Sequence, residues 1–169
     1  MRLFIALEPD NGIKRKLAFA QNRLRESGVG GNFTQPENLH ITLAFIGEYG
    51  DPKKVLSVMR SVPFRGCRAE FDGTGCFPGI CYAKVNVGKD LYSYVNELRS
   101  ALGSAGIPYD KKRFAPHITL IRKVCGDIPD GVMINGFAEI DRVTLFRSDR
   151  VGGRMIYTGI GHAVMTKEK

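Results

Sequence analysis

One tetrapeptide, His-Ile-Thr-Leu, occurs twice in the sequence, at residues 40–43 and again at residues 117–120. Two of the three histidines of the chain lie in these copies. Side chains at positions i and i+2 of a β-strand share a face, so the histidine and threonine of each copy point one way while the isoleucine and leucine point the other. Two such strands facing each other would gather two imidazoles and two hydroxyls in one groove.

This set of side chains suits the hydrolysis of a phosphate ester. One imidazole can take a proton from attacking water and the other can give one to the departing oxygen, because the ordinary histidine pKa near 6.5 makes both states accessible at neutral pH. The hydroxyls of Thr42 and Thr119 can donate hydrogen bonds to the non-bridging phosphate oxygens. We therefore predict that His40 and His117 converge on one anion pocket. Which histidine is the acid does not follow from the motifs, since they are identical.

A zinc site is the other interpretation of paired histidines. Such a site normally needs three protein ligands, often including a carboxylate. The only acidic residue near either motif is Glu37, which lies three residues before His40 and outside the predicted strand. We therefore expect no metal and no cofactor. His162 has no comparable context, so we expect it to be structural.

The elements that must position the two motifs are predicted in a repeated order, strand–helix–strand. Apolar periodicity places these elements at residues 2–7, 11–27 and 39–46, and then at residues 81–87, 90–104 and 115–121. Between these elements we predict a polar connection with glycines 28, 30 and 31 and a helix after Asp51-Pro52. Further strands are predicted at residues 65–71, at 132–146 with a break, and at 154–164. We therefore predict an α+β fold with two lobes related by a pseudo-twofold axis. Each lobe would have an antiparallel sheet with helices outside, the groove would lie between the lobes, and residues 1–169 would form a single bilobal domain.

Composition excludes several classes of protein. The chain has 169 residues, of which 43% are hydrophobic and 25% charged, so it is neither disordered nor fibrous. Its apolar runs are too short for a membrane span, and acidic Glu8 and Asp10 come too early for a secretory signal. We expect a cytoplasmic monomer that does not bind membranes.

The net charge of +8 favours a polyanionic partner. The basic residues of the predicted hairpin, Arg147, Arg150 and Arg154, fit a charged turn as well as an RNA contact.

The paired motifs and their surroundings resemble the two-histidine (2H) phosphoesterases. The residues that carry the resemblance are Pro36-Glu37-Asn38-Leu39 and Arg113-Phe114-Ala115-Pro116, which precede the motifs, the opening Arg2-Leu3-Phe4-Ile5-Ala6, and the segment 40–47. Within this superfamily, the chain is most similar to the bacterial and archaeal RNA 2′,3′-cyclic phosphodiesterases, formerly called 2′-5′ RNA ligases.

The resemblance implies metal-independent hydrolysis of a 2′,3′-cyclic phosphate at an RNA end, or on a nucleotide, to a 2′-phosphate. His40 would be the proton donor and His117 the proton acceptor, with Thr42 and Thr119 on the phosphate. It further implies that Arg122 is a phosphate ligand and that Phe45 is a wall for base stacking. Both lie five residues after a histidine, and an odd offset on a regular strand points to the opposite face. Arg122 therefore reaches the groove only if its strand twists, bulges or ends before it.

Two alternatives remain open at this point. One is an RNA-end binding module that holds a terminal phosphate without turnover. The other is a 2′-5′ RNA ligase or phosphodiesterase that uses the same groove, because a ribose hydroxyl could replace water in the reverse reaction.

Overall fold

The structure is a computed structural model that describes residues 1–167. Its order of elements alternates strands with three α-helices and one 3₁₀ turn. The elements are β1 (Arg2–Leu7), α1 (Asn11–Glu26), β2 (Gly30–Phe33), η1 (Pro36–Asn38), β3 (Ile41–Glu48), α2 (Pro52–Ser61), β4 (Cys67–Phe77), β5 (Ile80–Val87), α3 (Lys89–Ser104), β6 (His117–Cys125), β7 (Asn135–Ile140), β8 (Arg142–Val151) and β9 (Arg154–Val164). Of these helices, none is long and apolar enough to cross a membrane within residues 1–167.

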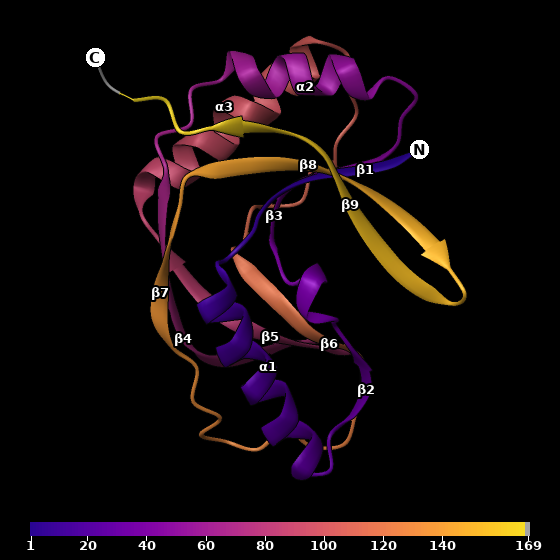
Figure 1. Cartoon of the computed structure of the whole chain (residues 1–169), viewed down its shortest axis with the longest axis vertical. Coiled ribbons are helices and arrows are strands. Elements are labelled where there is room, and N and C mark those ends of the chain that lie inside the picture. The colour runs from indigo at the N-terminus through magenta and orange to yellow at the C-terminus, as the bar shows by residue number, and fades with distance from the viewer. Residues whose placement is uncertain (168–169) are drawn as a thin grey trace.

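The strands form one antiparallel sheet with the two motif-bearing strands at its centre. The order is β7-β4-β5-β6-β3-β1-β8-β9, and β2 pairs with β6. The central strands β3 and β6 are joined through a single residue pair, Ile41 with Ile118. Strands β6, β5, β4 and β7 therefore belong to one lobe and β3, β1, β8 and β9 to the other (Figure 1). Both central isoleucines are fully buried, as the alternation in the motifs predicts.

Helices α1 and α3 have a crossed packing, because each packs on the lobe opposite to the strand that precedes it in the chain. Helix α1 follows β1 in the chain, but it packs against β6 and β7 of the other lobe. Helix α3 follows β5, yet it packs against β3, and α2 packs on α3 and β9 (Figure 1). The buried stripe of α1, which includes Ile13, Leu17 and Leu24, has the three- and four-residue spacing expected of an amphipathic helix.

The α+β bilobal fold predicted from the sequence is confirmed, with two local corrections. The connection after α1 is not only a loop, because Gly30–Phe33 forms β2. Gly31 there has a φ of +134°, and a Cβ would lie 2.7 Å from the carbonyl oxygen of Arg122, so only glycine fits. The strand expected from residue 132 begins at Asn135, and its break falls at Asp141, between β7 and β8.

Candidate active site

The register of β3 and β6 brings the two motifs face to face. Ile41 pairs with Ile118, and in an antiparallel ladder the next positions on either side are opposed as His40 with Thr119 and Thr42 with His117. These four residues are partly exposed, whereas the isoleucines and leucines of both motifs are buried. The charge of His117 also acts on the pKa of His40, which places the two rings within electrostatic reach. The register therefore places the two motifs opposite each other, with one histidine facing the threonine of the other motif on each side of the isoleucine pair.

Backbone carbonyl groups orient both imidazoles in the same way. Nδ1 of His40 lies 2.6 Å from the carbonyl oxygen of Asn38, and Nδ1 of His117 lies 2.7 Å from that of Ala115. A carbonyl only accepts, so Nδ1 carries the proton and donates it in both rings. Proton exchange with a substrate is therefore left to Nε2. Nε2 of His40 lies 2.9 Å from Oγ1 of Thr42, and that hydroxyl donates to the ring while the ring is neutral.

Burial lowers the pKa of His40 from 6.5 to about 4. The carbonyl of Asn38 opposes this shift, while the positive charges of Arg122, His117 and Lys14 add to it. The His40 ring is consequently neutral at pH 7 when the groove holds no anion. An anionic ligand beside these cations would raise the pKa again, because it stabilises the imidazolium and offsets the surrounding positive charge.

We expect the stability of the protein to fall as the pH drops from about 6.5 to about 4. Between these values the His40 imidazole binds a proton in the unfolded chain but not in the folded chain, so acid favours unfolding. One such proton changes the unfolding equilibrium by at most about tenfold per pH unit. Urea unfolding of the wild type and of His40→Asn at several pH values between 5 and 8 should show a shallower dependence in the variant. His162→Asn, at an exposed histidine, is the matched control. Equal slopes for wild type and His40→Asn would contradict this account.

A β-bulge at the last residue of each motif changes which side chains face the groove. In the pairing of β1 with β3, Ile5 faces Ala44 and Ala6 faces Thr42, so Leu43 is skipped. In the pairing of β5 with β6, Leu120 is skipped in the same way. An extra residue reverses the alternation beyond it. Phe45 and Arg122 therefore share the groove face with the motif threonines despite their odd offsets.

The positions of Arg122 and Phe45 agree with this reversal. Arg122 is exposed, and its charge acts on His40. Phe45 pairs with Phe4 across β1 and β3 and packs against the cluster that contains Phe4, whose ring contacts that of His40. The Arg2 guanidinium lies over the Phe45 ring, 5.0 Å from its centroid.

Two helix side chains hold the bulges in place. Arg99 on α3 donates from Nε and Nη2 to the carbonyl of Leu43, at 3.0 and 2.8 Å. Gln21 on α1 donates from Nε2 to the carbonyl of Leu120 at 3.0 Å, and Thr34 donates its backbone N–H to the same oxygen. A bulge removes carbonyls from the regular ladder, and these donors satisfy them. The sequence analysis missed both residues, since their partners are 56 and 99 positions away.

Each histidine ring also contacts a pair of aromatic side chains that were not predicted from the sequence. Phe4 and Tyr157 lie 4.9 and 5.4 Å from His40, centroid to centroid. Phe77 and Tyr82 lie 5.3 and 5.4 Å from His117. Tyr82 pairs with Thr119 across β5 and β6, so cross-strand position was the only available signal. The members of each pair also contact each other, with centroids 4.9 Å apart for Phe4 and Tyr157 and 4.4 Å apart for Phe77 and Tyr82, so each imidazole packs against one aromatic pair.

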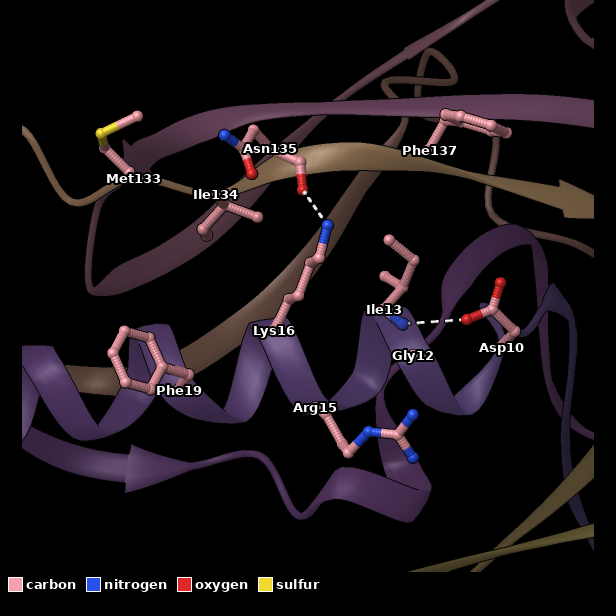
Figure 2. A pocket seen from close by; sticks show the side chains of 10 residues that line it. All are labelled: Asp10, Gly12, Ile13, Arg15, Lys16, Phe19, Met133, Ile134, Asn135 and Phe137. Carbon is pink, nitrogen blue, oxygen red and sulfur yellow. Dashed lines mark hydrogen bonds between the residues drawn. The ribbon is translucent and has the colours of Figure 1, made fainter.

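Another cavity, of about 670 Å³, lies between α1 and the start of β7 (Figure 2). It contains neither motif. Its carboxylate, Asp10, accepts the N–H of Ile13 at the helix start, and Lys16 donates to the carbonyl of Asn135 at 3.3 Å. Asp10 and Lys16 are thus engaged in structural hydrogen bonds. Over residues 1–167, no cluster of three or more His, Cys, Asp or Glu side chains has the arrangement of a metal site.

Comparison with known proteins identifies the family of this chain. The family described as LigT like Phosphoesterase matches residues 7–85 and 82–157, one match for each half. The chain belongs to this phosphoesterase family. The resemblance that the two motifs indicated is therefore confirmed.

Relatives of this LigT-like chain share a name. It is 34% identical to an RNA 2′,3′-cyclic phosphodiesterase of Archaeoglobus fulgidus over 72% of each chain. It is 24% identical to the protein of that name from Methanothermobacter thermautotrophicus, over 94% of this chain and 95% of the relative. Among solved structures, Escherichia coli LigT complexed with 3′-AMP aligns over 98% of both chains with a TM-score of 0.87 and 24% identity. A Thermus thermophilus protein aligns over 98% of both chains with a TM-score of 0.84 and 26% identity.

Proposed function

We propose that this protein hydrolyses the 2′,3′-cyclic phosphate at an RNA end to a 2′-phosphate, without a metal ion. The observation that carries the proposal is the pair of equivalent histidines, whose Nδ1 atoms are held by carbonyl groups two residues upstream and whose rings interact electrostatically. The names of the relatives, RNA 2′,3′-cyclic phosphodiesterase, support the substrate. Because each lobe supplies one motif, we also infer that residues 1–169 act as a single bilobal domain.

The reaction we propose is an in-line displacement at phosphorus. Nε2 of His117 accepts a proton from water as its oxygen forms a bond to phosphorus. The bond from phosphorus to the 3′ oxygen breaks, and Nε2 of His40 donates its proton to that oxygen. The two rings end with exchanged protonation states, which solvent resets. In-line attack needs the two groups on opposite sides of phosphorus, as two strands related by a pseudo-twofold axis would supply.

His40 must be protonated to act as the donor, although burial makes it neutral in the free protein. The substrate itself provides the missing charge, because a cyclic phosphodiester is an anion. Seated beside His40 it raises the pKa of that ring, while Arg122, Thr42 and Thr119 bind the non-bridging oxygens. Substrate binding and charging of the acid are therefore coupled.

The test is incubation with a nucleoside 2′,3′-cyclic phosphate in buffer containing EDTA. We expect a 2′-phosphate product and a rate unchanged by the chelator, because proton transfer by two imidazoles needs no metal. Loss of turnover in EDTA that is restored by a divalent cation would exclude the metal-free reaction. A 3′-phosphate product would show that the other P–O bond breaks. Binding without turnover would favour the RNA-end binding module, and a faster reaction on a 2′-5′ linked oligomer would favour the ligase-type activity.

A further inference from the structure

A second hollow begins at the proposed phosphate site and leads away from it. This cavity, of about 690 Å³, is lined by Arg122, whose charge acts on His40, and by Tyr157, whose ring contacts the His40 ring. From there it runs between β2 and the β8–β9 hairpin. In Figure 1 the hairpin projects beyond the rest of the sheet on the same side of the view as β2.

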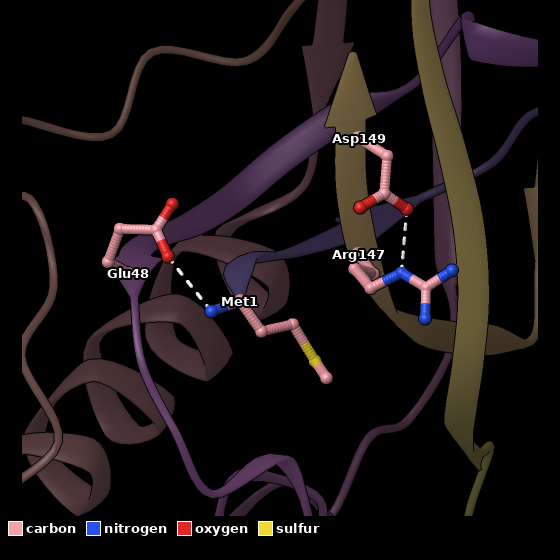
Figure 3. Close-up of polar contacts among 4 residues, drawn as sticks. All are labelled: Met1, Glu48, Arg147 and Asp149. Atoms are coloured by element: carbon pink, nitrogen blue, oxygen red, sulfur yellow. Dashed lines mark hydrogen bonds and ion pairs between the residues drawn. The ribbon is translucent and has the colours of Figure 1, made fainter. Parts of the chain in front are cut away.

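The charge of this hollow is of one sign. Over the described residues 1–167, its lining contains four arginines and no aspartate or glutamate. The four are Arg25, Arg122, Arg150 and Arg154. The hairpin arginine outside the lining, Arg147, instead forms a 2.7 Å ion pair with Asp149 (Figure 3). Of the three hairpin arginines, the one outside the hollow is paired with a carboxylate and the other two line the hollow. A turn that is charged only for solubility would not need this arrangement.

The walls of the hollow also include a planar stacking surface and a hydrogen bond that fixes the hairpin relative to His40. The Arg25 guanidinium lies over the Phe33 ring, 4.0 Å from its centroid, and a nucleobase can stack on either group. Asn38 donates from Nδ2 to the carbonyl of Met155 at 2.9 Å. The same Asn38 holds the His40 ring through its own carbonyl. One residue therefore links the hairpin to the reacting end of the groove.

We propose that this hollow binds the RNA chain on the 5′ side of the cyclic phosphate. Arg150 and Arg154 would contact backbone phosphates, and the Arg25–Phe33 pair would stack a base. This inference rests on the proposed function. A cyclic phosphate occupies the 2′ and 3′ oxygens, so the chain can leave the terminal ribose only through its 5′ oxygen. With the cyclic phosphate at Arg122, the hollow that Arg122 also lines is the space for the next nucleotides.

The test compares a 2′,3′-cyclic mononucleotide with a four-nucleotide RNA that ends in a 2′,3′-cyclic phosphate. For the double variant Arg150→Ala/Arg154→Ala, we expect kcat/KM on the oligomer to fall about tenfold or more, with no change on the mononucleotide. The dependence of log kcat/KM on log salt should become shallower by about 0.7 for each lost phosphate contact. Arg147→Ala removes one positive charge from the same hairpin outside the hollow, and should leave both substrates unaffected.

Three results would overturn the inference. Equal losses on both substrates would show that the hollow holds the terminal nucleotide itself. Equal effects of Arg147→Ala and the double variant would show that the positive charge of the hairpin attracts RNA as a whole, without contacts in the hollow. No loss on either substrate would show that RNA does not use the hollow. The mononucleotide rate also reports that the variant is folded. If the wild type hydrolyses neither substrate, the proposed function fails. The hollow can then still be tested by fluorescence anisotropy, which measures the affinity of a labelled 3′-phosphorylated oligomer for the wild type, the double variant and Arg147→Ala.

Discussion

Replacement of His40 or His117 by alanine should lower kcat/KM on a 2′,3′-cyclic phosphate by about 10²–10⁴-fold, the usual contribution of a positioned acid or base. Carbonyl groups orient both rings through Nδ1, and each ring packs against an aromatic pair, so alanine removes a group whose position is fixed. The losses should not add in the double variant, because the acid and the base act in the same step. Steady-state rates of release of the 2′-phosphate measure this.

A substrate with a good leaving group separates the roles of the two histidines. A phosphodiester that releases p-nitrophenolate needs no proton at the departing oxygen, so His40→Ala should regain much of its rate on this substrate. His117→Ala should not, since water still has to be activated. His162→Ala is the control, with full activity expected. Recovery by His117→Ala instead of His40→Ala would reverse the assignment, and activity of both variants near that of the wild type would refute acid–base catalysis by this pair.

Replacement of Arg99 by alanine should lower kcat by about 10- to 10²-fold with little change in KM, although Arg99 is not a residue of either motif. The variant leaves the bulged Leu43 carbonyl without its two guanidinium hydrogen bonds, and small displacements of reacting groups cost rates of this order. An unsatisfied buried carbonyl should also lower the free energy of unfolding by about 1–3 kcal/mol. Urea unfolding and mononucleotide kinetics measure the two effects.

Gln21→Ala is the matched comparison at the other bulge. Its effect should be smaller, because the Leu120 carbonyl keeps the hydrogen bond from the backbone N–H of Thr34. Arg99→Lys, with one remaining donor group, should restore part of the rate. If Arg99→Ala loses stability but retains kcat, the bulge does not position the site.

The sequence predicted the features that depend on local periodicity. Alternation within His-Ile-Thr-Leu correctly assigned one face of each motif to the core, where Ile41 and Ile118 are fully buried, and left the histidine and threonine on the partly exposed face. The repeated strand–helix–strand order was sufficient to predict two related lobes. Helical spacing placed α1 and α3 to within one residue at each end.

The rest depends on contacts between distant segments. The side on which Arg122 and Phe45 lie follows from bulges, and these are held by side chains from the opposite half of the chain. Strand β2 has only four residues, begins with two glycines and lacks an apolar alternation, so its pairing with β6 had no local signature. The aromatic rings beside the histidines come from β1, β9, β4 and β5, and no sequence spacing connects them.

Because of the crossed packing, each half of the chain supplies a helix that packs on the strands of the other half. Helix α1 supports Leu120 in the second half, and helix α3 supports Leu43 in the first. A polypeptide comprising only one copy of the repeat would lack the donor for its own bulge, yet two identical copies could supply it to each other by exchanging helices. The architecture is therefore that of two helix-exchanging copies joined into one chain, and such a chain would give the proposed reaction centre an internal pseudo-twofold axis and one histidine from each copy.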